Sequence, residues 1–354
     1  MTVEKLSFNT LNAMRGIAAI GVMVFHGATL LGVQYFPRGY LAVDLFFVLS
    51  GFVIGHAYDP RLAAGMGWRT FARIRLIRFY PLYLLGLSIG IVRELGLIAT
   101  HNDYAFGPSG LLLSIAAALF FIPMPLPQRD YTLFTLNIPS WSLMYELIAN
   151  IAYAVAFPRL TNKVLMVLTG GAGVLLAAYV LWTGTVDIGG HAADIPGALV
   201  RTAFSFGTAL LIFRLGVRGI RVPPILILLA VGLCLIVPDV VGVAYDLIFV
   251  LLISPLLVVL GASAEPSPAM RKGFIWLGII SFPLYAIHRP VLSLTEGAAK
   301  AAGLSGYWMG ALAMVAIVAV SSLLDRHFDG PIRRAVATRF GTRPVRDPAE
   351  AAAP

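Results

Sequence analysis

The sequence is poor in charged residues and has almost no cysteine. Only 12% of its 354 residues are Asp, Glu, Lys or Arg, against 59% hydrophobic residues, whereas soluble domains carry about 25% charged residues. The single cysteine, Cys234, lies in an apolar run and excludes a disulfide framework or a zinc cluster. The chain also lacks a G-x-S-x-G elbow, a P-loop, an H-E-x-x-H motif and a helix-opening G-x-G-x-x-G motif. We therefore predict a polytopic membrane protein with no metal site and no permanently bound cofactor.

Apolar segments long enough to cross a bilayer fill most of the chain. A spanning helix needs about 20 mainly apolar residues, and glycines, prolines and charge clusters mark the boundaries between such segments. One stretch, 109–123, is too short to span and runs into proline-rich sequence, which predicts a re-entrant or interfacial hairpin beside a cavity. The predicted fold is an all-α polytopic membrane protein with one such hairpin and about ten transmembrane helices, at residues 10–33, 40–58, 76–98, 139–157, 164–183, 196–215, 223–238, 241–261, 274–294 and 306–328.

Basic residues cluster between these segments and give the chain its net charge of +9. Their placement follows the positive-inside rule, so it indicates orientation and not a nucleic-acid partner. The N-terminal sequence is too short and too acidic for a signal peptide, so the first span is expected to stay in the mature protein. We expect both termini in the cytoplasm, a single integral-membrane domain at 1–330, and a basic, partly disordered cytoplasmic tail at 331–354. The loops predicted to be cytoplasmic are 59–75, 158–163, 216–222 and 262–273.

The first predicted span carries two ionisable side chains, Arg15 and His26. A central arginine costs roughly 2.5–3.5 kcal/mol even on lenient insertion scales, so such groups persist where they face a bundle interior or a wet cavity. The two residues differ by only ~20° around the helix and lie about 16 Å apart along it. One face therefore offers a cation near one membrane surface and an imidazole deeper in. Taken singly, they also fit a snorkelling arginine and a structural histidine.

Asp44 is a candidate to orient His26. It lies near the outer end of the second predicted span, at about the depth of His26 if the first two spans form a hairpin. A carboxylate beside a histidine fixes its tautomer and raises its basicity, which is the usual arrangement of a general base. The alternative is an interfacial aspartate that caps the helix N-terminus.

The fourth predicted span contains a second carboxylate, Glu146, in otherwise apolar sequence. It must be paired, protonated or facing water, and it is the second candidate to act with His26. Ser142 lies four residues earlier and so shares its face. Trp141 precedes it at the outer interface, where a tryptophan is more often an aromatic-belt anchor.

The third predicted span begins with Arg75 and Arg78, which are three residues apart and share a face. A basic run before a span is usually only a topology signal. At the apolar boundary, however, two guanidinium groups on one face also suit a phosphate-rich ligand that arrives from the cytoplasm. Both interpretations stay open from these residues alone.

The ninth predicted span carries one polar stripe. Ser281, Tyr285 and His288 follow one another at spacings of four and three residues, which places them on one face of a helix. Pro283 and Pro290 are expected to kink this helix and to free backbone carbonyl groups toward a cavity. A lone histidine there would be structural, whereas a Ser–Tyr–His stripe favours a functional role.

Six short motifs follow one another along nearly the whole chain: Arg15 with His26, DLFFVLSGF at 44–52, Arg75 with Arg78, PSWSLMYE at 139–146, ISFPLYAIH at 280–288 and DRHFDGPI at 325–332. In this order they resemble integral-membrane acyltransferase family 3, the O-acyltransferases of surface polysaccharides and related glycosides. The resemblance implies that Arg15 and His26 are essential and that cytoplasmic acetyl-CoA is the donor. The sequence departs from the family pattern at Pro283, where a polar or aromatic residue is more common, and at Asp325, where glutamate is common.

The residues and the resemblance together predict a membrane O-acetyltransferase. His26, oriented by Asp44 or Glu146, is expected to act as general base or as transient acyl acceptor, and Arg15, Arg75 and Arg78 to bind the phosphates of the donor. Acceptor binding or proton transfer is assigned to Trp141, Ser142, Ser281, Tyr285 and His288.

The expected partners are acyl-CoA as co-substrate, a carbohydrate or glycolipid acceptor, and the bilayer of a bacterial inner membrane. The oligomeric state stays open. The alternative function is a proton-coupled transporter or flippase in which Asp44, Glu146, His26 and His288 form a proton relay. A non-catalytic membrane scaffold is disfavoured by the number of ionisable groups within the spans.

Overall fold

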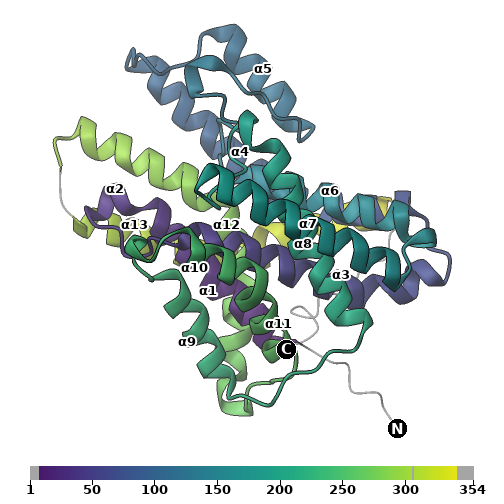
Figure 1. The fold of residues 1–354 in the computed structure, drawn as a ribbon. Coiled ribbons are helices and arrows are strands. Elements are labelled where there is room, and N and C mark those ends of the chain that lie inside the picture. The colour runs from purple at the N-terminus through teal and green to yellow at the C-terminus, as the bar shows by residue number, and fades with distance from the viewer. Residues whose placement is uncertain (1–7, 305–306, 341–354) are drawn as a thin grey trace.

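The computed structural model describes residues 8–304 and 307–340, and within these ranges every regular element is a helix (Figure 1). The all-α prediction is therefore confirmed. The long helices are α1 (Asn9–His26), α3 (Ala42–Ala63), α4 (Trp68–Ala99), α6 (Ser140–Ala156), α7 (Asn162–Thr183), α8 (Ile195–Arg214), α12 (Pro268–Ala301) and α13 (Tyr307–Leu324). The shorter ones are α2 (Ala28–Leu31), α5 (Pro108–Leu119), α9 (Pro224–Leu235), α10 (Val243–Ile248), α11 (Ser254–Ala262) and α14 (Gly330–Arg339).

Seven helical segments in the described part of the chain are long and apolar enough to cross a membrane. The three other predicted spans, 10–33, 139–157 and 223–238, contain α1, α6 and α9, which have 18, 17 and 12 residues. The count of ten spans and the cytoplasmic termini therefore stay predictions. The seven segments are Gly39–Ala63, Trp68–Ala99, Asn162–Thr183, Ala192–Arg214, Val243–Ala262, Pro268–Ala301 and Tyr307–Arg339.

Helix α1 packs along α12 near the centre of the bundle (Figure 1). Two glycines let the helices approach closely. A Cβ atom on Gly16 would lie 2.4 Å from the carbonyl oxygen of Leu277, and one on Gly278 would lie 2.8 Å from the Cβ atom of Asn12. Small residues are the usual means of close helix packing in membranes. This contact brings the first predicted span against the polar stripe of the ninth.

Helix α4 extends beyond the main bundle together with α5 (Figure 1). The Tyr83 hydroxyl donates a hydrogen bond to the carbonyl oxygen of Ala118 at 2.6 Å, and the Tyr83 ring stacks on Phe121 with ring centroids 3.8 Å apart. The predicted hairpin at 109–123 thus contains a 12-residue helix fixed to α4 by its C-terminal end. Its length agrees with a segment that is too short to span.

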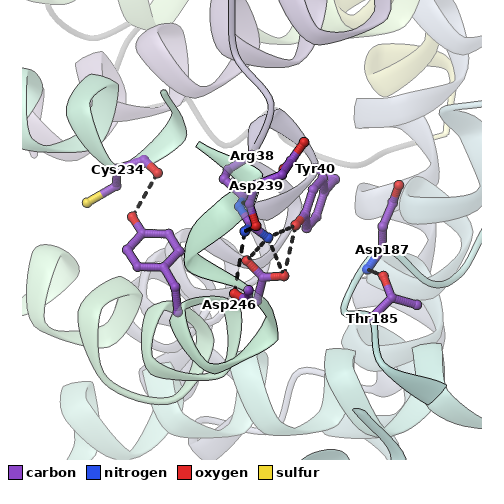
Figure 2. A network of polar contacts seen from close by, with 9 residues as sticks. Arg38, Tyr40, Thr185, Asp187, Cys234, Asp239 and Asp246 are labelled. Atoms are coloured by element: carbon purple, nitrogen blue, oxygen red, sulfur yellow. Dashed lines mark hydrogen bonds and ion pairs between the residues drawn. The ribbon is translucent and has the colours of Figure 1, made fainter. Parts of the chain in front are cut away.

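The loop before α3 is fixed to the loop before α10 by the guanidinium group of Arg38 (Figure 2). Its Nη1 atom donates to the two carboxylate oxygens of Asp246 at 2.6 and 2.8 Å and to the Tyr40 hydroxyl at 2.6 Å. Its Nη2 atom donates to the carbonyl oxygen of Asp239 at 3.1 Å. Because Arg38 and Asp246 are both buried and mutually paired, this network is a structural link.

The predicted cytoplasmic tail begins as a helix. Residues 330–339 form α14, which packs against α4, while residues 341–354 lie outside the described part of the chain. The sequence contains five arginines after Asp329 but gives no sign that some of them return to the membrane domain. This return supplies two of the basic side chains described next.

Candidate active site

A cavity of about 200 Å³, called here the arginine pocket, opens between α1, α3, α4, α6, α12 and α14. Its apolar walls include Phe46, Phe79 and Phe282. Five arginines line it among the described residues: Arg15, Arg75, Arg78, Arg333 and Arg334. The structure thus brings together all three predicted donor-binding residues and adds two from α14 that the sequence analysis assigned to the tail.

Carboxylates and aromatic rings hold these guanidinium groups in place. Arg75 pairs with Glu146 at 3.2 Å and lies over the ring of Phe79, with 4.8 Å from Cζ to the ring centroid. Arg78 lies 3.7 Å from Asp329, and Arg333 lies 2.9 Å from the same carboxylate. Asp325 also pairs with Arg333, at 3.4 Å. Of the described residues that line the pocket, five are arginines and Glu146 is a carboxylate, so the lining is rich in positive charge.

Glu146 faces this pocket, as expected of a carboxylate that must be paired. Besides Arg75, its Oε1 atom accepts a hydrogen bond from the Ser50 hydroxyl at 2.5 Å. The structure thus places Glu146 beside Arg75 in this pocket. Glu146 was expected to act with His26. Its observed partners differ because α3, α4 and α6 converge here, which no local sequence pattern reveals.

Three hydroxyl groups, those of Ser142, Ser281 and Tyr285, also line the pocket. The hydroxyl oxygens of Ser142 and Tyr285 are 2.6 Å apart, and Ser142 also donates to the carbonyl oxygen of Pro139 at 2.9 Å. Ser281 donates to its own helix at the Gly278 carbonyl oxygen. The predicted common face of Ser281 and Tyr285 on α12 is confirmed.

His26 and His288 form a direct pair. Nδ1 of His26 lies 2.9 Å from Nε2 of His288, and the two rings stack with centroids 5.1 Å apart. The ring of His288 is also 5.6 Å from that of Tyr285, so the pair is one side chain away from the arginine pocket. His288 is fully buried and His26 half-buried.

The hydrogen bonds of His288 decide which nitrogen of His26 is basic. Nδ1 of His288 lies 2.8 Å from the carbonyl oxygen of Tyr285. Because a carbonyl oxygen can only accept, this Nδ1 carries the proton, and Nε2 of a neutral His288 is then an acceptor. Nδ1 of His26 therefore donates to His288, and its Nε2 keeps the free lone pair. This is the tautomer required of a general base or nucleophile.

Asp44 does not take part in this pair, which corrects the expectation that it orients His26. Its two oxygens accept hydrogen bonds from Arg201 of α8, at 2.8 Å from Nε and 2.5 Å from Nη2, and both side chains are fully buried. Arg201 also donates to the carbonyl oxygen of Ile188 at 2.9 Å. Arg201 was not among the predicted site residues, although an arginine inside a predicted span is itself a signal for a buried carboxylate partner.

Trp141 covers this ion pair and lines neither of the two main cavities. Its ring lies 6.0 Å from Cζ of Arg201. A Cβ atom on Gly189 would lie 2.4 Å from the same ring, and Gly189 has φ +130, so only glycine fits there. In the same loop, burial raises the pKa of Asp187, an effect that Arg201 opposes. Trp141 is thus packed inside the protein and is not a belt residue.

A second cavity of about 230 Å³, the loop pocket, lies between the far end of α4, the segment 128–138 and the C-terminal half of α12. Pro290 has no N–H group, so the Ala286 carbonyl oxygen accepts instead from Nδ2 of Asn137 at 2.9 Å. This confirms the prediction that Pro290 frees a carbonyl group beside a cavity. The polar lining residues are Arg93, Tyr104, Gln128, Arg129, Asp130, Thr132, Thr135, Asn137, Arg289 and Ser293.

The family model described as an acyltransferase domain matches residues 8–326. This range includes Arg15, His26, the arginine pair of α4 and the histidine of α12. The chain belongs to acyltransferase family 3. It is therefore an acyltransferase, and the resemblance inferred from the six motifs is confirmed.

Three relatives illustrate the range of this acyltransferase family. The chain is 36% identical to "Protein 2 in picA locus" of Rhizobium radiobacter over 48% of its own length and 94% of the relative. It is 26% identical to the exopolysaccharide production protein ExoZ of Rhizobium meliloti, covering 80% of the chain and 85% of that protein. It is also 26% identical to the acyltransferase MdmB of Streptomyces mycarofaciens, covering 98% and 96%. No solved structure matches the chain.

Proposed function

We propose that this acyltransferase transfers an acyl group, acetyl in the simplest case, from cytoplasmic acyl-CoA to a hydroxyl group of a membrane-associated or extracytoplasmic glycan. One observation carries the proposal: Tyr285 lines the arginine pocket, and its ring lies beside the His26–His288 pair. Membership of the family supports the reaction type. A relative named for exopolysaccharide production supports the acceptor class.

The arginine pocket suits the donor because coenzyme A carries several phosphate charges and a long flexible arm. Guanidinium groups bind phosphate through paired, charge-assisted hydrogen bonds. In this proposal Arg75, Arg78, Arg333 and Arg334 hold the phosphates. The arm then passes Arg15 along α1 toward His26, a distance of about 16 Å for eleven residues of helix.

The chemical step uses the lone pair on Nε2 of His26. The acceptor hydroxyl gives its proton to this nitrogen while its oxygen attacks the thioester carbonyl carbon. The C–S bond then breaks, the ester forms, and the proton passes from His26 to the departing sulfur. His288 keeps Nδ1 of His26 as donor, so it positions the base in the way that a carboxylate does in other enzymes.

The remaining predicted residues take supporting roles in this proposal. Ser142, Ser281 and Tyr285 line the pocket and in this proposal lie next to the thioester. Glu146 orients Arg75. The ion pair of Asp44 with Arg201, which lies beside the Trp141 ring, links α3 to α8. A proton relay through Asp44, Glu146 and both histidines is disfavoured, because each carboxylate is occupied by an arginine.

For the protein's setting we propose the inner membrane of a bacterium, with both termini and the arginine pocket on the cytoplasmic side. The basic loops and tail support this orientation through the positive-inside rule. Coenzyme A derivatives are cytoplasmic, so the donor would then meet its pocket directly.

The test is acyl transfer by the purified protein in lipid nanodiscs, with radiolabelled acetyl-CoA and bacterial exopolysaccharide fragments. Wild type should label the glycan. The variant His26→Asn should lose about 10²–10⁴-fold in rate, the usual contribution of general base catalysis. The matched control is His101→Asn, in an exposed loop whose φ of 49 an asparagine tolerates.

A normal rate in the His101→Asn protein would show that a His→Asn change does not by itself impair the enzyme. The loss in the His26→Asn protein would then be due to loss of the base. Transfer at the wild-type rate by the His26→Asn protein would contradict the assignment of His26. Failure of the wild-type protein to acylate any glycan would contradict the proposed function itself.

A further inference from the structure

The loop pocket is a polar cavity of about 230 Å³ that the donor does not explain. We propose that it binds a sugar ring of the acceptor glycan, with the hydroxyl to be acylated directed at the His26–His288 pair. This inference rests on the proposed function and adds the place and the residues of acceptor binding, which neither the sequence motifs nor the relatives assign.

The chemistry of the lining fits a sugar. Its polar groups include the amides of Gln128 and Asn137 and the hydroxyls of Thr135 and Ser293, which offer both donors and acceptors. Tyr104 adds an exposed aromatic ring at the rim. Small-molecule sites typically combine such orienting polar groups with an apolar or aromatic wall. A sugar hydroxyl needs this mixture of donors and acceptors.

The charges of the loop pocket are already balanced inside the protein. Arg129 binds both oxygens of the fully buried Glu94, at 2.7 and 2.8 Å, and Arg93 lies 3.4 Å from the same group. Arg289 lies 3.6 Å from Glu296. A polyanion therefore gains little here, because the guanidinium groups are engaged. A polyhydroxylated ligand can still use their remaining N–H groups.

The position on α12 connects the loop pocket to the histidine pair. Phe282 and Tyr285 line the arginine pocket, while Arg289 and Ser293 line the loop pocket. These four residues are spaced by three or four, so one face of α12 passes from one pocket to the other. His288 stands at the junction, directly before Arg289.

In this proposal two hydrogen bonds beside α12 form a partition between the pockets. On one side Tyr285 is bonded to Ser142, and on the other Asn137 is bonded to the carbonyl oxygen of Ala286. Donor and acceptor would thus enter from opposite sides and meet at the histidines. Such a partition also keeps water in the loop pocket away from the thioester.

The test is cysteine protection in the full-length protein, in a Cys234→Ala background that removes the natural thiol. Two variants form a matched pair on α12: Ser293→Cys in the loop pocket and Ser281→Cys in the arginine pocket. Each is labelled with a small methanethiosulfonate reagent, alone, with deacylated exopolysaccharide oligosaccharides, or with coenzyme A. Gln128→Cys, at an exposed position of the loop pocket, repeats the measurement if Ser293→Cys reacts slowly.

Saturating oligosaccharide should slow labelling of the Ser293→Cys protein at least tenfold, and coenzyme A should not. The Ser281→Cys protein should show the reverse. In parallel, Gln128→Ala should raise the KM for the oligosaccharide several-fold with an unchanged dissociation constant for coenzyme A.

The inference is overturned if oligosaccharide that the wild-type enzyme acylates protects neither loop-pocket variant, or if coenzyme A protects them. That result leaves the proposed function intact, since acyl transfer is measured separately. If the wild-type enzyme acylates no glycan, the proposed function fails first and this inference with it.

Discussion

The arginine pocket and the loop pocket have similar volumes, about 200 and about 230 Å³, and one face of α12 lines both. They differ in their charges. In the described residues, five arginines line the first, and three carboxylates line it or pair with those arginines. Three arginines line the second, and the three carboxylates counted in the same way are Glu94 and Glu296, which pair with them, and Asp130, which lines the pocket. Surplus positive charge in a region of low dielectric favours a polyanionic ligand, and a balanced set favours a neutral polar one. The contrast predicts which substrate each pocket takes.

The largest expected effect is at the junction of the pockets. His288→Leu removes the acceptor for Nδ1–H of His26, so the base loses its fixed tautomer, and kcat should fall by about 10²–10⁴-fold. His288→Gln places an amide oxygen in the same region and should restore part of this loss. The pH profile of kcat distinguishes positioning from packing, because only positioning changes it. A Leu variant with a normal kcat and pH profile would refute the role of His288.

Asp44 should behave differently because it lies in neither pocket. Asp44→Ala leaves the buried Arg201 without its partner, which should lower the free energy of unfolding by about 3–5 kcal/mol. Denaturant unfolding in nanodiscs measures this, with the exposed Asp103→Ala as control. Replacing both partners, as Asp44→Asn with Arg201→Gln, should recover part of the stability. Loss of activity with unchanged stability would instead make Asp44 catalytic, as the sequence suggested.

The arginine pocket should lose donor affinity when one guanidinium group is removed. A hydrogen bond to a charged group contributes about 1.5–3 kcal/mol, so Arg334→Gln should raise the dissociation constant of coenzyme A roughly tenfold or more. Arg339→Gln on the same helix is the control, since Arg339 lines neither pocket. Binding of labelled coenzyme A gives both values. If the two substitutions raise the dissociation constant equally, Arg334 contributes only to the overall positive charge and does not contact the donor.

The smallest expected effect is that of salt. Raising KCl from about 50 to about 500 mM shortens the Debye length to roughly 4 Å, so the dissociation constant of coenzyme A should rise several-fold. The KM for the oligosaccharide should change little, because the loop pocket has no excess charge. Titrations at several salt concentrations test both. A parallel rise in the two constants would remove the contrast between the pockets.

The sequence predicted correctly those features that depend on residue types and their spacing within a single helix. The face of Ser281 and Tyr285, the carbonyl group freed by Pro290, and the position of Arg75 with Arg78 were all predicted and observed. The expected pairing of Asp44 or Glu146 with His26 was not observed, because pairings between helices depend on packing. Asp44 forms an ion pair with Arg201 because α3 packs on α8. Glu146 forms one with Arg75 because α6 packs on α4. No single-helix pattern carries this information.

Two parts of the site come from segments that sequence reasoning assigned elsewhere. Arg333 and Arg334 were placed in a tail, yet α14 returns them to the arginine pocket. His26 and His288 were recognised separately, but their direct contact depends on the close approach of α1 to α12 at Gly16 and Gly278. Glycines at these two positions were visible in the sequence, and their partner helices were not.

A structure of the protein with bound acetyl-CoA is the decisive measurement for this mechanism. We predict that the phosphates lie among Arg75, Arg78, Arg333 and Arg334. The thioester carbonyl carbon should lie near Nε2 of His26, with space between them for an acceptor oxygen at ~3–3.5 Å, the distance of a reactive geometry. A donor bound outside the arginine pocket, or a thioester remote from His26, would contradict it.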